Sequence, residues 1–281
     1  MILIADSGST KTHWRFIDPD GAIQQLHTAG LNPYFVTDDD LAKAIQEGPA
    51  NLLPAEAVSE LHFYGSGLGA TEPIARLHKV LGEFFPNAKL FIEHDLLGAA
   101  RALCGRNEGL ALILGTGANS CYYNGTEIVQ NVASAGYILG DEGSGADLGK
   151  RWISAWLNDR VPHDLADAFF NAYALNRDIV LKNVYSGSRP NRYLASFTPF
   201  LREHAKHPYV AQLITDAFNE LFERYLVRYP KHRELPLHAC GSIAWYFAPL
   251  LRSVAEQHGM HVGNTVKEPI AALTLYHLGE A

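Results

Sequence analysis

The sequence has little that would mark a secreted, membrane-spanning or metal-binding protein. Its three cysteines, Cys104, Cys121 and Cys240, lie far apart in apolar runs without a CxxC motif, so we expect reduced core residues. No apolar run reaches the ~18 residues of a membrane span, and the N-terminal residues lack the pattern of a signal peptide. The 13 histidines form no HExxH pair. We therefore expect a cytoplasmic protein without a catalytic zinc.

Positive charge is also scarce. The chain has 23 Lys and Arg against 30 Asp and Glu, a formal net charge of -7, which argues against nucleic acid or an anionic membrane as the main partner. Apolar residues make up 47% and charged residues 19%, an ordinary globular composition. A chain of 281 residues is long for one hydrophobic core, so we expect two lobes.

A pattern of three short strands joined by turns occurs twice, at residues 2–27 and 110–132. This repetition predicts two similar lobes. In the first lobe we expect strands at 2–5, 13–17, 22–27, 60–67 and 88–95 and helices at 38–53, 71–86 and 96–104. In the second lobe, helices are expected at 145–157, 162–175, 191–205, 208–229 and 242–259, a last strand at 235–241, and a final helix at 268–278.

Each copy contains a turn rich in glycine and hydroxyl groups, "DSGSTKT" from Asp6 and "GTGANS" from Gly115. Backbone amides and Ser or Thr hydroxyls in such turns bind phosphate oxygens without net positive charge. Neither turn matches a Walker loop or the GxGxxG fingerprint. A decorated hairpin is the alternative for the first turn.

Together these turns and the segment "HACGSIAW" resemble the two phosphate motifs and the adenosine motif of the actin, hexokinase and heat-shock ATPase superfamily. Within it, "GLNPYF", "EHDLLGAARA" and "AGYILGDEGSGADLG" resemble the N-acetylglucosamine kinase branch of the BadF/BadG/BcrA/BcrD ATPase group. The resemblance implies an α/β fold with two ribonuclease H-like lobes of actin-like ATPase type and an interlobe cleft. It places the first lobe at 1–108, with the helix at 267–281 packing back on it, and the second, larger lobe with helical insertions at 109–266.

The resemblance also implies an ATP site with Mg²⁺. Asp6 would hold Mg²⁺ through water, its alternative role being a turn cap. Gly241 and Ser242 would lie beside adenosine, and a helix N-cap is the alternative role for that pair. The terminal phosphates would contact Gly8, Ser9, Thr10, Thr12, Gly115, Thr116 and Gly117.

By position, Asp95 resembles the general base of the family, and its alternative role is to cap the helix at 96–104. The acceptor sugar would contact Asn32, Gly136 and Asp141, with Ser66 a weaker candidate and Asp95 reaching its hydroxyl. Glu142 and Asp147 are interpreted as helix-start acids. The aromatic residues 245–247 are interpreted as core rather than as an adenine stack.

The function that these features favour is an ATP-dependent sugar kinase, a phosphotransferase with an alcohol acceptor. N-acetylglucosamine at the 6-hydroxyl is the leading substrate, with N-acetylmuramate and glucosamine as rivals. One alternative is a non-kinase BadF-type ATPase that couples hydrolysis to a partner protein, although the three cysteines do not match a cluster-binding pattern. Another is a sugar-sensing regulator, for which we expect no room for a DNA-binding module before the first strand. A homodimer is possible.

Overall fold

The structure is a computed structural model that describes residues 1–8 and 10–280, and it contains two compact units. Unit 1 comprises Met1–Arg106, Gly125–Glu127 and the segment from Pro269 onward, and unit 2 comprises Asn107–Asn124 and Ile128–Glu268. The boundaries predicted after residues 108 and 266 lie two residues from these divisions.

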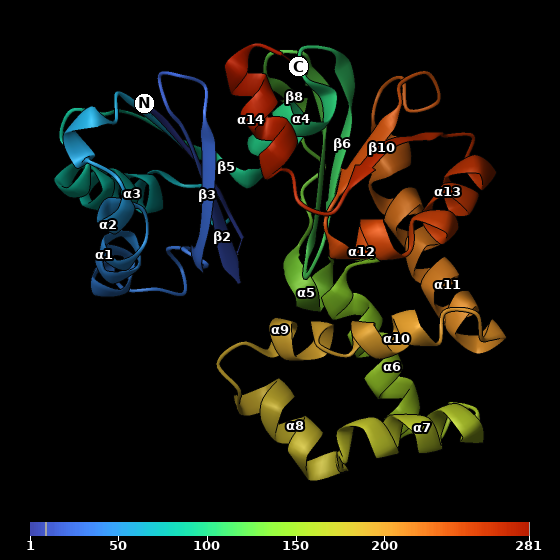
Figure 1. Ribbon diagram of the computed structural model, residues 1–281. Coiled ribbons are helices and arrows are strands. Elements are labelled where there is room, and N and C mark those ends of the chain that lie inside the picture. The colour runs from blue at the N-terminus through green and yellow to red at the C-terminus, as the bar shows by residue number, and fades with distance from the viewer. Residues whose placement is uncertain (9, 281) are drawn as a thin grey trace. The chain divides into compact units, whose positions relative to one another are not determined.

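Unit 1 is built on a five-stranded mixed sheet of order β3-β2-β1-β4-β5 (Figure 1). β2 is antiparallel to β1 and β3, whereas β1, β4 and β5 run parallel. Its elements are β1 Ile2–Ser7, β2 Lys11–Ile17, β3 Ile23–Ala29, α1 Asp38–Glu47, α2 Pro49–Leu52, the 3-10 turn Ala55–Ala57, β4 Glu60–Gly65, α3 Thr71–Phe84, β5 Lys89–His94, α4 Asp95–Cys104 and α14 Ile270–Leu278.

The central strand β1 is buried on both faces. Successive side chains of a strand point to opposite faces, and Leu3 packs in one core cluster with residues of α1 and α3. Ile4 packs in a second cluster with Ile270 and Leu273 of α14. Each such fully buried Leu or Ile stabilises the fold by about 1.5–3 kcal/mol. The last helix of the chain therefore completes the core of the unit that the first strand begins.

A partly polar cluster lies under α14. Arg101 Nη1 donates to the Tyr64 hydroxyl at 2.8 Å, and that hydroxyl lies 3.0 Å from His277 Nε2. Since Arg101 supplies one proton, the Tyr64 proton is left to donate to a neutral His277. The His277 ring contacts the ring of His62, which stacks on Phe91. Burial lowers the pKa of His277 to about 3 and also lowers the pKa of His62.

This cluster predicts a loss of stability in mild acid. Both histidines resist protonation in the folded protein, while in the unfolded chain they take up protons below their ordinary pKa of 6.5. The free energy of unfolding should therefore be full above pH 6.5 and fall below it, by about 1.4 kcal/mol per pH unit for each histidine that stays neutral. Urea unfolding between pH 5 and 7 measures this slope. In the His277→Gln variant, about one proton fewer should be taken up on unfolding, so the slope should be smaller by about 1.4 kcal/mol per pH unit. An unchanged slope in that variant would contradict the assignment.

Unit 2 repeats the sheet of unit 1. Read from its other edge, its order is β8-β7-β6-β9-β10, with β6, β7 and β8 antiparallel and β6, β9 and β10 parallel. The predicted α/β class and duplication are confirmed. Its strands are β6 Glu108–Leu114, β7 Ala118–Asn124, β8 Ile128–Gln130, β9 Leu237–Cys240 and β10 Val262–Val266.

The helices of unit 2 share one large core with its sheet, in which Leu112 of β6, Trp152 and Phe218 are fully buried. Trp152, Phe169 and Phe200 form an aromatic group with ring centroids 5.1–5.4 Å apart. The helices are α5 Gly136–Leu139, α6 Gly145–Leu157, α7 His163–Tyr173, α8 Arg177–Ser186, α9 Pro190–Ala195, α10 Thr198–Glu203, α11 Pro208–Arg224, α12 Ser242–Tyr246 and α13 Ala248–Gln257, with a 3-10 turn at Leu226–Arg228.

Three expected helices are interrupted at prolines. The helix expected at 38–53 is divided at Gly48, before Pro49. Pro199 and Pro249 are the second residues of α10 and α13, which begin at Thr198 and Ala248 after α9 and α12 have ended. Proline has no N–H to donate and its ring clashes with the carbonyl four residues earlier. The single helices expected at 38–53, 191–205 and 242–259 were therefore wrong in their continuity.

Two α-helices and one strand were not anticipated: α5, α8 and β10. The strand expected to be last, at 235–241, is followed by β10, which forms the edge of the sheet of unit 2. α8 buries Val180 alone among its residues, so its sequence shows only a weak apolar stripe.

Candidate active site

The first polar turn of unit 1 is shorter than expected because β2 begins at Lys11. Ser7 and Thr12 face each other across the hairpin, with their hydroxyl oxygens 2.8 Å apart. Thr12 donates to the Ala29 carbonyl at 3.0 Å, and Ser7 Oγ accepts from the Leu31 N–H at 3.1 Å. In this arrangement Thr12 holds the turn in shape, and a contact between Thr12 and phosphate stays a prediction.

The backbone of the turn is fixed at both sides. Gly8 N–H donates to the Lys11 carbonyl at 3.0 Å, and the Thr10 carbonyl accepts from Gly30 N–H at 3.1 Å. Ser9, also expected at the phosphates, lies outside the described residues. The strands on either side of this turn form a hairpin, which was the alternative interpretation of the segment, and its contact with phosphate stays a prediction.

Three predicted site residues follow one edge of the sheet of unit 1. Ser7 of β1 pairs with Gly65 of β4, which pairs with His94 of β5. Asp6, Ser66 and Asp95 therefore stand at or just beyond the carboxyl ends of three parallel strands. This is the edge at which ligands bind in open α/β sheets.

Asn32 and Ser66, both predicted to bind the sugar, contact each other. The buried Asn32 donates from Nδ2 to Ser66 Oγ at 3.2 Å, and its Oδ1 accepts from the Tyr34 N–H at 3.0 Å. The next residue, Gly67, has φ +81°, and a Cβ there would lie 2.4 Å from Asn32 Oδ1. Gly67 is therefore a supporting residue that the sequence analysis missed, although the "GSG" pattern could have indicated it.

Asp95 is the first residue of α4, but it does not cap the helix. The N-cap is His94, whose Nδ1 accepts from the Leu96 N–H at 3.1 Å. The alternative role of Asp95 as a helix cap is therefore wrong. Asp95 Oδ1 lies 2.8 Å from the same His94 Nδ1, and this hydrogen bond raises the pKa of His94. The Asp95 side chain is 22% exposed, which is enough to meet a substrate.

In unit 2, the turn Gly115–Gly117 is docked on the start of α6. Gly145 N–H donates to the Gly115 carbonyl at 2.8 Å, and Ala146 N–H donates to the Thr116 carbonyl at 3.0 Å. These donors are among the first N–H groups of the helix, which have no partner within it. The turn and α6 therefore fix each other.

Asp141 and Gly136, expected at the sugar, are joined through Ser134. The Ser134 hydroxyl donates to Asp141 Oδ1 at 2.6 Å and accepts from the N–H groups of Asp141 and Gly136. Burial raises the pKa of Asp141, and a Cβ on Gly117 would lie 3.0 Å from its Oδ2. Asp141 thus lies against the predicted phosphate turn of its own unit. Ser134 was missed because no local motif marks it.

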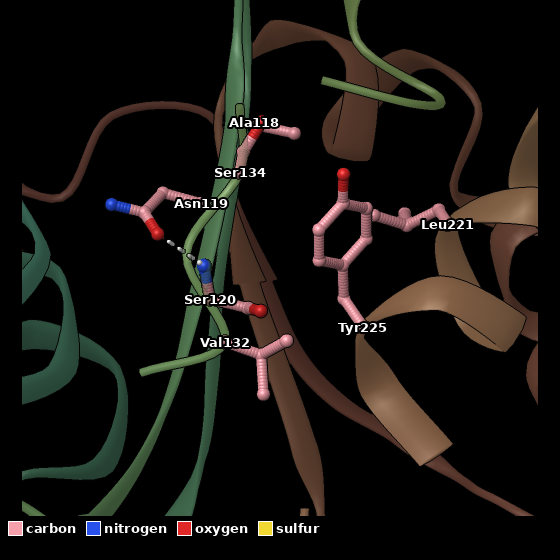
Figure 2. A pocket seen from close by; sticks show the side chains of 7 residues that line it. All are labelled: Ala118, Asn119, Ser120, Val132, Ser134, Leu221 and Tyr225. Atoms are coloured by element: carbon pink, nitrogen blue, oxygen red, sulfur yellow. Dashed lines mark hydrogen bonds between the residues drawn. The ribbon is translucent and has the colours of Figure 1, made fainter. Parts of the chain in front are cut away.

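A small pocket, with room for hardly more than one water molecule, lies beside this network. Figure 2 shows residues of β7 and of the segment after β8 on one side, and on the other side Leu221 of α11 and Tyr225, the residue that follows this helix. The Tyr225 hydroxyl donates to Glu142 at 2.5 Å, and burial raises the pKa of Tyr225 to about 12. The lining residues are Ala118, Asn119, Ser120, Val132, Ser134, Leu221 and Tyr225.

Glu142 differs from its expected role as a helix-start acid. It is 5% exposed, precedes α6, and accepts from Arg224 Nη1 at 2.6 Å as well as from Tyr225. Asp147 does lie in the first turn of α6, where its carboxylate accepts from Gly143 N–H and Arg151 Nε. The interpretation as a helix-start acid therefore holds for Asp147, and it is wrong for Glu142, which lies before the N-cap Ser144 and is held by Arg224 and Tyr225 of a distant segment.

The adenosine motif lies at the end of β9. Gly241 has φ +112° and is the N-cap of α12, so the N-cap alternative is confirmed for this glycine. A Cβ on Gly241 would lie 2.4 Å from the Leu114 carbonyl, which brings the motif against the start of the second polar turn. Ser242 is the first residue of α12.

The aromatic residues that follow do not all belong to the core. Phe247 is 3% exposed, but Trp245 is 48% and Tyr246 is 39% exposed. Arg202 and Lys267 lie over the Tyr246 ring, 4.4 and 5.4 Å from its centroid. The core interpretation was therefore wrong for Trp245 and Tyr246.

Comparisons with known proteins place this fold. A scan against protein-family models finds no match, and a search of curated proteins finds none. Among solved structures, a candidate N-acetylglucosamine kinase from Porphyromonas gingivalis is 38% identical, with 99% of each chain covered and a TM-score of 0.94. The chain belongs to the N-acetylglucosamine kinase-like family.

More distant structures share the fold of this N-acetylglucosamine kinase-like protein. A candidate N-acetylglucosamine kinase from Chromobacterium violaceum is 21% identical over 98% of both chains, with a TM-score of 0.68. A ROK family glucokinase from Streptomyces griseus, solved with glucose and AMPPNP, is 15% identical over 98% of this chain and 97% of that chain, with a TM-score of 0.53. The BadF grouping itself stays a prediction.

The Mg²⁺ expected from the sequence would not need a site built by protein ligands alone. The described residues contain no group of three His, Cys, Asp or Glu that could hold a metal ion. Mg²⁺ commonly takes only one or two carboxylates and completes its shell with phosphate oxygens and water. Asp6 at the end of β1 fits such a role.

The cysteines and the apolar helices were the features that bear on disulfides and membrane spans. All three cysteines are buried and none forms a disulfide, and burial raises the pKa of Cys104 to about 12. Within the described residues, no helix combines the length and the apolarity that crossing a membrane requires.

Proposed function

We propose that this protein transfers the γ-phosphoryl group of ATP to an amino sugar, with N-acetylglucosamine as the acceptor and its 6-hydroxyl as the site. The observation that carries the proposal is the similarity to the Porphyromonas gingivalis protein over 99% of both chains. A cytoplasmic location and a homodimer, expected from the sequence, belong to the same proposal.

In the proposed reaction, Asp95 takes the proton of the sugar hydroxyl while the hydroxyl oxygen bonds to the γ-phosphorus and the bond to the β-phosphate oxygen breaks, releasing ADP. Phosphoryl transfer has a loose transition state, so positioning and charge stabilisation supply most of the acceleration. Asn32 and Ser66, already in contact, together with Gly136 and Asp141, would orient the sugar.

The nucleotide is proposed to bind through both polar turns. Gly8, Ser9, Thr10 and Thr12 of unit 1 and Gly115, Thr116 and Gly117 of unit 2 would contact phosphates, and Gly241 and Ser242 would contact adenosine. Mg²⁺, held by Asp6 with water and phosphate oxygens, would neutralise charge on the phosphates.

A coupled ATPase that passes electrons through a metal cluster is not favoured. Such a cluster would need cysteine ligands that can meet at a subunit interface. Cys104 is buried in unit 1, and Cys121 and Cys240 are buried in unit 2.

The proposal is tested by ADP release from Mg-ATP with N-acetylglucosamine, glucosamine, N-acetylmuramate, N-acetylmannosamine, glucose or no sugar. We expect strong stimulation by N-acetylglucosamine and little by glucose. Phosphorus NMR of the product should show a 6-phosphate, and EDTA should abolish turnover. Hydrolysis independent of sugar, or none with any sugar, would contradict the kinase assignment.

A further inference from the structure

His94, the last residue of β5 and the neighbour of Asp95, has two partners for one side-chain atom. Its Nδ1 lies 3.1 Å from the Leu96 N–H and 2.8 Å from Asp95 Oδ1. An imidazole nitrogen carries either a proton or a lone pair. The Leu96 N–H needs the lone pair and the Asp95 carboxylate needs the proton, so the two hydrogen bonds exclude each other.

A second histidine shows what a purely structural cap looks like. His207 is the N-cap of α11, and its Nδ1 accepts from the Tyr209 N–H at 3.1 Å. Its acidic neighbour, Asp164, approaches the other nitrogen, Nε2, at 3.5 Å. His207 can therefore cap its helix and face a carboxylate at once, whereas His94 cannot.

We propose that His94 is a positioning residue for Asp95: protonated, it holds Oδ1 through its Nδ1–H, and neutral, it turns Nδ1 to the Leu96 N–H and releases the carboxylate. This inference rests on the proposed role of Asp95 as general base. The released carboxylate accepts the proton of the sugar hydroxyl, while the held carboxylate has Oδ1 occupied by the Nδ1–H of His94 and is fixed in one orientation.

Asp95 is the charged group that acts on His94, because the charged groups on the neighbouring elements interact with other residues. Across the sheet, His94 pairs with Gly65, which does not titrate. On α4, Arg101 bonds to Tyr64, and the charge of Glu93 on β5 also acts on Tyr64. On α3, which packs on β5, Arg76 bonds to Asp38.

The pH dependence follows from the direction of the shift. The hydrogen bond to Asp95 raises the pKa of His94 above its ordinary value of 6.5. Below that raised pKa the held state dominates, so kcat should fall by up to about tenfold per pH unit, as for loss of one essential deprotonated group. Above it, the released state dominates and kcat reaches its plateau.

The test compares His94→Asn with His207→Asn, because asparagine is itself a strong N-cap and does not titrate. We expect the acid limb of kcat in the wild-type protein to lie above pH 6.5 and to move at least one pH unit lower in His94→Asn. The KM for the sugar should stay unchanged, and His207→Asn should retain the wild-type profile. A wild-type acid limb in His94→Asn would overturn the proposal and leave His94 as a cap like His207.

A readout without turnover separates this proposal from the proposed function. NMR titration of the His94 ring should show a lower midpoint in Asp95→Asn than in the wild-type protein. If the midpoint does not move, the pairing is overturned even in an active kinase. If it moves in a protein that phosphorylates no sugar, the pairing stands and the assignment of the reaction fails.

Discussion

Asp95→Asn is expected to lower kcat by about 10²- to 10⁴-fold, the usual contribution of a general base, while the affinity for the sugar changes little. The amide keeps the shape of the carboxylate and can still donate to or accept from a sugar hydroxyl, but it cannot take up a proton. Because His94 rather than Asp95 caps α4, the helix should remain. The measurement is steady-state kinetics together with sugar binding by calorimetry.

Asp39→Asn is the matched control. Asp39 is also an acid in the first turn of a helix, α1, and its side chain is exposed. It should show wild-type turnover. If Asp95→Asn keeps activity within a few-fold of this control, Asp95 is only a helix-start acid and another group must serve as the base.

Gly149→Ala is expected to destabilise unit 2 severely, by about 3 kcal/mol or more, at or beyond the upper end for overpacking. Gly149 lies on α6 where α9 packs against it, and a Cβ there would lie 1.9 Å from the Leu194 carbonyl oxygen. That atom belongs to backbone, which cannot move aside as the end of a flexible side chain can. Urea unfolding followed by far-UV circular dichroism measures the loss.

The same substitution at Gly82 should have the opposite sign. Gly82 lies within α3, and the nearest atom to a Cβ there, Leu90 Cδ1, is at an ordinary contact distance of 3.9 Å. Alanine is favoured over glycine inside a helix by up to about 1 kcal/mol, so Gly82→Ala should stabilise unit 1 slightly. Similar effects at the two positions would show that the close approach of α6 and α9 is not rigid.

The duplicated sheets could be predicted from sequence because their signals are local. In both copies, apolar strands end at turns rich in Gly, Asp or Asn, and the strand order in the structure is the same in each. The breaks before Pro49, Pro199 and Pro249 were also readable from sequence, since proline ends a helix for local reasons. The continuous helices expected there gave too much weight to apolar periodicity.

The elements that escaped prediction depend on distant partners. β10, with the sequence "VGNTV", has a glycine and an asparagine at its centre, both disfavoured in strands, and it becomes a strand by pairing with β9. Its Gly263 is required by that packing, because a Cβ there would lie 2.8 Å from the His238 ring. Strand propensity reflects such surroundings more than the residue itself.

In the site, too, local signals could be predicted from the sequence and distant partners could not. Motifs could name Asp95, Asn32 and Asp141, but not the groups that orient them. Ser134 reaches Asp141 across seven residues, and Glu142 meets Tyr225 across 83. Such partners become visible only when the tertiary structure brings them together.

The position of α14 in unit 1 has a consequence for how the protein is made. The chain between Arg106 and Pro269 is 162 residues long, and a ribosome adds it in roughly 8–30 s at about 5–20 residues per second. During that time the first sheet is present without the helix that covers Ile4 and bonds to Tyr64 through His277. Unit 1 thus begins first and is completed last, and its uncovered face is the surface that a chaperone would protect on the nascent chain.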